Sequence, residues 1–193
     1  LGKRLEPLHI LIGILVADGQ LDVWASAPVD EWSDPADPRH EITIDDLLGM
    51  RSGLEWTEGY SGDTDVTDML FGEGAANRGA FAAARPLDDE PGEVWEYSTG
   101  TSMILANVIA GTVGHGADGV DWAQQELFGP LGISTVRHTL DDSGAMSGGS
   151  MIDMMALDFA RFGYLYLRGG EWDGEQIVPE AWVDYAHLPI PGA

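Results

Sequence analysis

The segment 91–109 constrains the fold of this chain more than any other. It begins with a Pro-Gly turn, continues as a short extended stretch that ends in Tyr97, and enters an apolar run through Ser98 and Thr99. Hydroxyl side chains at such a point cap the free N–H groups of a helix and fix where it begins. The pattern predicts a helix over 99–113 with a tyrosine at its entrance. An ordinary core tyrosine followed by capping residues explains the same residues without any function.

Most other segments are also helical by pattern. The apolar stretch 8–18 predicts a buried helix that Gly19 stops. Thr43, with Asp46 three residues on, forms a weak capping box for a helix that we expect to end at Gly53. We expect the helix over 99–113 to be amphipathic. Further predictions are helices over 64–72, 78–84, 121–128, 151–167 (capped by Ser150, with Asp153 as return partner) and 179–187, a strand over 135–140, and a hairpin turn at Asp173-Gly174.

The order of these segments sets the fold class. A chain of 193 residues can bury one sizeable core, so we expect a single domain over 1–193. Residues 20–40 are rich in Pro and Asp and form a connection within it. The strand–helix alternation of a doubly wound sheet is missing. The prediction is a mainly α partial domain, the helical lobe of a two-lobed fold with little of the central sheet and an uncovered apolar face.

Several further segments carry a family resemblance. They are the run from Ile42 to Leu54, Phe128-Gly129-Pro130-Leu131-Gly132-Ile133, Gly148-Gly149-Ser150-Met151, the run from Ala156 to Gly163, and Gly169-Gly170-Glu171-Trp172-Asp173-Gly174. With the Tyr-Ser-Thr-Gly segment at 97–100, they resemble the β-lactamase-related serine hydrolases. That group includes class C β-lactamases, family VIII carboxylesterases, D-alanyl-D-alanine peptidases and 6-aminohexanoate-dimer hydrolases. The resemblance runs from about Leu11 to about Tyr185 and implies the α/β fold of serine β-lactamases and penicillin-binding proteins.

The sequence departs from this family at the nucleophile. The family's serine lies in Ser-x-x-Lys, where the lysine one helical turn on takes the hydroxyl proton. The only lysine here, Lys3, has no residue three places before it, so the motif cannot be written. One alignment puts Gly2 and Leu5 at the two positions; another keeps Lys3 and places the serine before Leu1. Both stay open, and we expect a fragment of a longer chain that is inactive alone.

The resemblance assigns Tyr97 as the catalytic residue of this chain. In the family this tyrosine faces the serine and lysine and helps to move the proton to the leaving group. A tyrosine with its usual pKa near 10 needs a lysine ammonium nearby to act as a base. Thr99 stands where many relatives have a substrate-binding Asn. That departure argues against β-lactam recognition and is compatible with esterases and amide hydrolases.

Four more residues are candidates for substrate binding. In the 6-aminohexanoate-dimer hydrolase branch a loop tyrosine in a place similar to Tyr60 reaches the substrate amide, and Trp56 could wall the same cleft. The alternative is an aromatic pair that anchors an acidic loop. Gly148 and Gly149 would form backbone near the cleft, although a glycine pair before a helix needs no function.

Charge excludes some partners. The chain has 33 acidic and 9 basic residues, a net charge of −24, and such repulsion favours solubility but disfavours a compact state at low salt. The acids are spread along the chain, which favours adaptation to high salt; a basic partner is the alternative. Nucleic-acid binding is disfavoured, because phosphates need Lys and Arg.

No cofactor or metal is predicted. Cysteine is absent, the acidic run around Asp65 lacks the Gly and Glu of a calcium loop, and the five histidines show no zinc-type spacing. No apolar run is long enough to span a membrane, and no signal peptide is evident, which leaves the compartment open between cytoplasmic and exported.

Two functional hypotheses remain. The first is part of a serine hydrolase that cleaves esters or small amides through an acyl-serine intermediate. The second is a non-catalytic homologue, or a binding module that kept the cleft. They differ in whether a serine completes the motif at Lys3. An unrelated acidic helical protein would require all the ordered matches to be chance.

Overall fold

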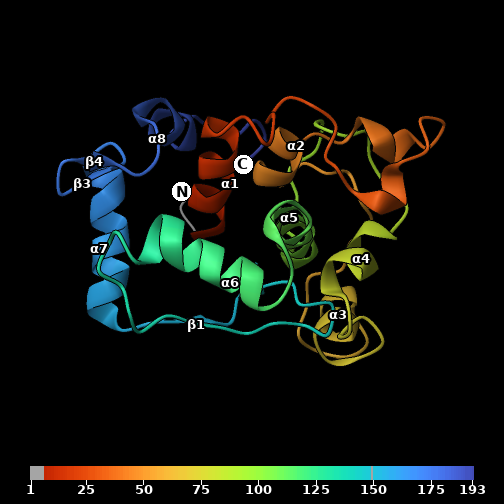
Figure 1. Cartoon of the computed structure of the whole chain (residues 1–193). Helices are drawn as coiled ribbons and strands as arrows, with labels where there is room; N and C mark the ends of the chain where they lie inside the picture. Colours follow the sequence, from red (N-terminus) through yellow and green to blue (C-terminus); the bar gives the residue numbers. More distant parts are fainter. Residues whose placement is uncertain (1–6, 149) are drawn as a thin grey trace.

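Helix α5 (Thr99–Val113) lies in the middle of the protein, and α1 (Pro7–Ala17), α2 (Ile44–Leu48), α4 (Arg78–Ala83) and α6 (Ala117–Ala123) pack against it (Figure 1). The structure is a computed structural model that describes residues 7–148 and 150–193. Eleven of the fifteen residues of α5 are buried, over most of its circumference. The expectation of an amphipathic helix was therefore wrong, because neighbouring helices cover α5 on several sides.

The remaining elements complete a mostly helical chain. Two short 3-10 turns interrupt the irregular connection 20–40, and a π turn continues α6 to Phe128. The 3-10 turns are Asp30–Trp32 and Pro38–Glu41, and the π turn is Gln124–Phe128. The other helices are α3 (Asp65–Phe71), α7 (Ala156–Leu167) and α8 (Glu180–Ala186). The strands are β1 (Arg137–His138), β2 (Ile152–Asp153), β3 (Glu171–Trp172) and β4 (Glu175–Gln176). Within the described residues the strands form two two-stranded antiparallel sheets, which confirms a helical lobe with little of a central sheet.

Local capping signals predicted several helix starts correctly. The Thr43 Oγ1 accepts from the Asp46 N–H at 3.1 Å and the Asp46 carboxylate accepts from the Thr43 N–H at 3.1 Å, so the capping box is present. This helix ends at Leu48 rather than Gly53, because Met50 takes a positive φ of 56° that breaks the helix. The buried helix over 8–18 is confirmed as α1, within one residue at each end.

The predicted start of the helix after Ser150 was wrong. Residues Ile152–Asp153 pair instead with Arg137–His138, so this segment is extended and Asp153 is not a capping partner. Helix α7 begins only at Ala156, and Thr135 accepts a hydrogen bond from the Met155 N–H just before it. The predicted strand over 135–140 is correspondingly short. Pairing with a distant segment decided both boundaries.

The hairpin turn is confirmed. Asp173 and Gly174 join β3 to β4 with φ of 50° and 85°, the two left-handed residues that a two-residue hairpin loop needs. The next helix, α8, begins one residue after Pro179, which stands at its N-cap instead of its first position.

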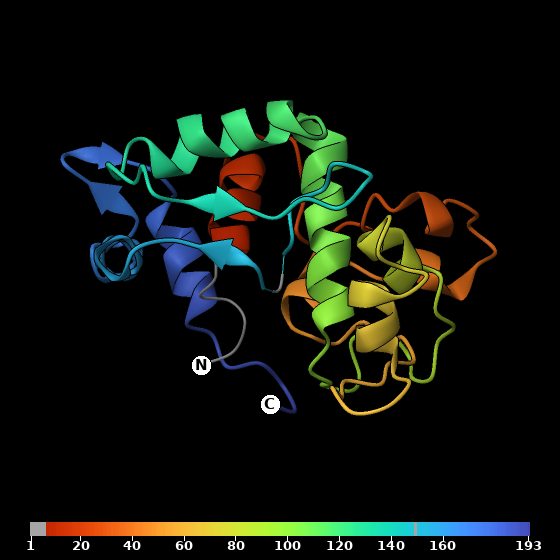
Figure 2. The same ribbon diagram turned by 90° about the horizontal axis from the view of Figure 1, so that it is seen from below.

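One side of α7 is apolar and open to solvent. Leu157, Tyr164 and Leu167 are 63%, 50% and 83% exposed, and their spacing places them on one side of the helix. Figure 2 shows α7 and the β3–β4 hairpin at one end of the molecule, with α3 and α4 at the other. This side of α7 is therefore an apolar face that no other described element covers.

Candidate active site at the N-terminal end of helix α5

Tyr97 lies at the entrance to α5. Ser98 has an extended backbone and its side chain accepts the Thr101 N–H at 3.1 Å, which makes it the N-cap and fixes the helix start. Ser98 and Thr99 are buried, whereas Tyr97 is 42% exposed. The capping residue thus turns the chain inward directly after Tyr97 and leaves that ring at the surface.

The turn before Tyr97 is fastened to the segment after α2. Gly92 and Arg51 exchange backbone and side-chain bonds: the Gly92 N–H donates to the Arg51 carbonyl and the Arg51 guanidinium to the Gly92 carbonyl, both at 2.8 Å. The Glu96 N–H donates to the Met50 carbonyl at 2.9 Å. Arg51 is itself held by an ion pair with Asp45 at 2.8 Å. These contacts fix the approach of the chain to α5.

A second segment, the loop 56–64, meets this helix entrance (Figure 2). The Glu58 carboxylate accepts hydrogen bonds from the Thr99 N–H at 2.9 Å and the Thr99 hydroxyl at 2.6 Å. It also accepts from the Trp56 indole N–H at 2.7 Å and the Tyr60 hydroxyl at 3.3 Å. Three of the residues predicted from the sequence are therefore brought together by one carboxylate.

The surroundings of Tyr60 shift the pKa of its hydroxyl. The pKa of the Tyr60 hydroxyl is raised, first by partial burial and then by the neighbouring negative charge of Glu58 and by Tyr97; a hydrogen bond with Thr99 opposes the rise. Tyr60 remains 67% exposed, so the ring is within reach of a ligand in solvent. Trp56 is buried, and its ring lies so close to Gly100 that a Cβ there would come within 2.7 Å of it.

Gly148 contacts α5 one turn further on. Its N–H donates to the Met103 sulfur at 3.3 Å, and a Cβ at this position would lie 2.1 Å from the Ser102 carbonyl oxygen. Close packing therefore explains this glycine without a ligand. Gly149 lies outside the described residues, as do Gly2, Lys3 and Leu5, the positions that bear on the missing serine and lysine.

Glu58 is the site residue that the sequence reasoning missed. A signal for it exists, because Trp56, Glu58 and Tyr60 alternate in a segment outside any helix, and alternate residues of an extended chain share one side. Its main partner, Thr99, is 41 residues away in the sequence, so the pairing itself has no local signature.

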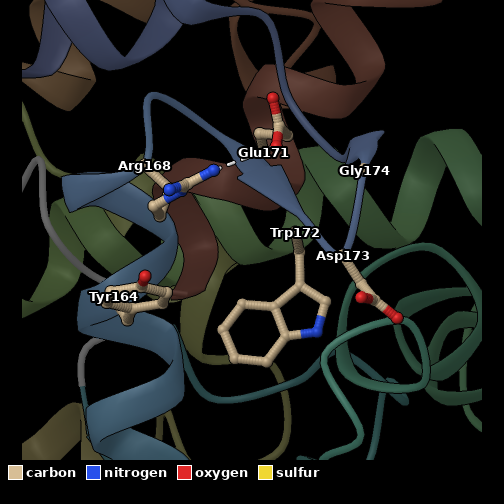
Figure 3. Close-up of a pocket in the computed structure, with 6 residues that line it drawn as sticks. All are labelled: Tyr164, Arg168, Glu171, Trp172, Asp173 and Gly174. Atoms are coloured by element: carbon tan, nitrogen blue, oxygen red, sulfur yellow. Dashed lines mark hydrogen bonds and ion pairs between the residues drawn. The ribbon is translucent and has the colours of Figure 1, made fainter.

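An open pocket of about 580 Å³ lies between α7 and the β3–β4 hairpin, with Tyr164 edge-on to Trp172 and Arg168 paired with Glu171 at 3.2 Å (Figure 3). None of the predicted site residues lines it. Among residues 7–148 and 150–193 no group of three acidic or histidine side chains is arranged to hold a metal ion, and no helix there is long and apolar enough to cross a membrane.

Comparison with known proteins identifies the family. The beta-lactamase family model matches residues 9–184. The chain belongs to the β-lactamase-related serine hydrolases. Its likeness to solved members of this fold is structural rather than close in sequence, and no curated protein matches it significantly.

Three solved structures illustrate the likeness. A Bacillus anthracis protein assigned as a 6-aminohexanoate-dimer hydrolase is 19% identical, with a TM-score of 0.75 over 92% of this chain and 50% of its own. The octameric penicillin-binding protein homologue from Pyrococcus abyssi is 19% identical, with a TM-score of 0.65 over 92% and 45%. A D-stereospecific amidohydrolase from Streptomyces sp. is 19% identical, with a TM-score of 0.62 over 95% and 63%. The chain thus spans about half to two thirds of their length.

Proposed function

We propose that this chain is the helical part of a serine hydrolase that cleaves esters or small amides through an acyl-serine intermediate. The observation that supports it best is the arrangement at α5, where Tyr97 stands at the helix entrance two residues before Thr99, whose hydroxyl shares the Glu58 carboxylate with the Tyr60 hydroxyl. In the family a Tyr-Ser-Ser-Gly-Thr-like segment carries the catalytic tyrosine, and Tyr97 begins the Tyr-Ser-Thr-Gly segment of this chain. The 1–193 chain holds no Ser-x-x-Lys and is inactive by itself in this proposal.

In the proposed reaction Tyr97 relays a proton to the leaving group. A serine oxygen supplied by the whole protein attacks the carbonyl carbon of the substrate while a lysine takes the serine proton. The bond to the alcohol or amine then breaks, and the Tyr97 hydroxyl relays that proton to the departing oxygen or nitrogen. Water hydrolyses the acyl-serine by the reverse roles, while backbone N–H groups stabilise the oxyanion in both steps.

The residues around Tyr97 favour a small ester or amide over a β-lactam. Thr99 replaces the family's substrate-binding Asn, and its side chain and N–H are already bonded to Glu58. The exposed Tyr60 hydroxyl suits contact with a neutral amide group. The two amide hydrolases among the similar structures point in the same direction.

A non-catalytic homologue is the second candidate. What favours it is Thr99, which stands where many relatives have a substrate-binding Asn, because its N–H and its hydroxyl are both bonded to Glu58. Such a protein would keep the exposed surface around Tyr97 for binding a ligand and would not turn it over.

Covalent labelling tests the two candidates. Intact-mass analysis follows incubation with a fluorophosphonate, and separately with a penicillin, of the 1–193 chain and of the chain encoded by the full reading frame. The proposal expects no adduct on 1–193 and one fluorophosphonate adduct on the full chain, formed more slowly in Tyr97→Phe. An adduct on folded 1–193 would refute the claim that these residues lack the nucleophilic serine. A full chain that is never labelled would favour the non-catalytic homologue.

A further inference from the structure

The Glu58 carboxylate is saturated with hydrogen bonds from two separate segments. One oxygen accepts the Trp56 indole N–H and the Thr99 N–H, and the other accepts the hydroxyls of Thr99 and Tyr60. Four donors are about as many as an ionised carboxylate can take. One side chain thus accepts hydrogen bonds from both the loop 56–64 and the first residue of α5.

The carboxylate also suits the helix end that it meets. Thr99 is the first residue of α5, so its N–H has no acceptor within the helix. A negative charge is favoured at this end, where the helix dipole is positive. Glu58 therefore acts as a second cap for α5, contributed by the loop 56–64, in addition to the Ser98 cap.

The loop has a separate anchor at its far end. The Thr57 N–H donates to the Asp65 carboxylate at 2.9 Å, and the Thr64 hydroxyl donates to the Gly59 carbonyl. These bonds tie the loop to the start of α3 but not to α5. At the entrance of α5 the Glu58 bonds join two direct contacts, the hydrogen bond between Tyr60 and Thr99 and the packing of the Trp56 ring against Gly100.

We propose that Glu58 is a positioning residue that holds the Tyr60 hydroxyl and the Trp56 ring against the first turn of α5, beside Tyr97. That these two aromatics then meet substrate rests on the proposed function. Their placement by Glu58 does not, because it follows from the hydrogen bonds alone.

Two substitutions separate the hydrogen bonds of Glu58 from its charge. In Glu58→Gln the amide oxygen can accept from the two N–H groups, while the amide nitrogen donates to the two hydroxyls, which can also act as acceptors. All four contacts then survive without the charge. Glu58→Ala removes the contacts as well. Glu73→Gln, an exposed glutamate after α3, is the matched control for loss of one charge.

The readout is the Trp56 indole N–H signal in a proton–nitrogen NMR spectrum, assigned by its disappearance in Trp56→Phe. We expect this proton to be protected from solvent exchange in the native chain, in Glu58→Gln and in Glu73→Gln. In Glu58→Ala it should move upfield and exchange faster, while the signals of buried α5 amides such as Leu105 stay. An unchanged indole signal in Glu58→Ala would overturn the proposal. Should Glu58→Ala not fold, loss of indole protection in well-folded Glu58→Gln would overturn it equally.

Ester hydrolysis by the full-length chain separates this proposal from the proposed function. Misplaced substrate contacts predict a kcat/KM lowered on the order of 10²-fold in Glu58→Ala, with most of it restored in Glu58→Gln. A changed indole signal in a protein without any hydrolysis would sink the proposed function and leave the positioning role intact. Normal hydrolysis by Glu58→Ala with an unchanged indole signal would refute the positioning role and leave the proposed function intact.

Discussion

Gly148→Ala tests how the segment before α7 packs on α5. The added Cβ would lie 2.1 Å from the Ser102 carbonyl oxygen and 3.1 Å from the Ala106 Cβ. Relief needs roughly 1 Å of movement, and the Ser102 oxygen belongs to the backbone of a buried helix, so no side-chain rotation can supply it. We expect a loss at the upper end of overpacking costs, about 3 kcal/mol. For a chain of this size that lowers the melting temperature by roughly 6–12 °C.

The assay is urea unfolding followed by far-UV circular dichroism, with Gly111→Ala as the control on the same helix. Nothing lies within 4 Å of a Cβ at Gly111, so alanine there should stabilise α5 by up to about 1 kcal/mol. The two glycine substitutions thus have opposite signs. A Gly148→Ala midpoint equal to or above that of the native chain would refute the close contact between this segment and α5.

Three more perturbations follow from the packing and the charges. Gly13→Ala would place a Cβ 2.3 Å from the Trp182 indole, so it should destabilise the α1–α8 contact by about 1–3 kcal/mol in urea unfolding; no change would contradict that contact. Arg51→Ala removes the positive charge beside two mostly buried aspartates and should cost about 3 kcal/mol, whereas Arg168→Ala, in an exposed pair, should cost under about 1 kcal/mol. Burial lowers the pKa of His138 below 6.5, so the folded chain resists its protonation. The folded chain therefore loses stability as the pH drops below 6.5, because the unfolded chain binds this proton more readily. His138→Phe should flatten the plot of unfolding free energy against pH in this range, and an identical plot would show that burial has no such effect.

Local chemistry predicted much of the helical structure. The Thr43 capping box, the Ser98 entrance to α5 and the Asp173-Gly174 hairpin turn each depend on residues within a few positions of one another. The start of α7 could not be found in this way. Residues Ile152–Asp153 carry a plausible helix start, but their pairing with β1 overrides it.

In the candidate site, too, the sequence predicted residues near a local signal and missed a contact between distant segments. The predicted α5 entrance places Tyr97 and Thr99, and the family resemblance supplies their proposed roles and those of Trp56 and Tyr60. What the sequence did not disclose is the role of Glu58, because it depends on a contact with α5 across 41 positions. A substrate-binding role for Gly148 stays a prediction, since its packing against α5 already accounts for the missing side chain.

The open side of α7 gives dissolved salt two opposing effects on this chain. At low ionic strength the net charge of −24 keeps separate copies apart, and the exposed Leu157 and Leu167 do not meet their counterparts on another molecule. At 0.1 M salt the screening length shrinks to about 10 Å, which relieves strain within each folded chain but also removes the barrier between copies. The fraction of chains that are both folded and monomeric should therefore pass through an optimum in salt, and beyond it copies should associate through the exposed side of α7.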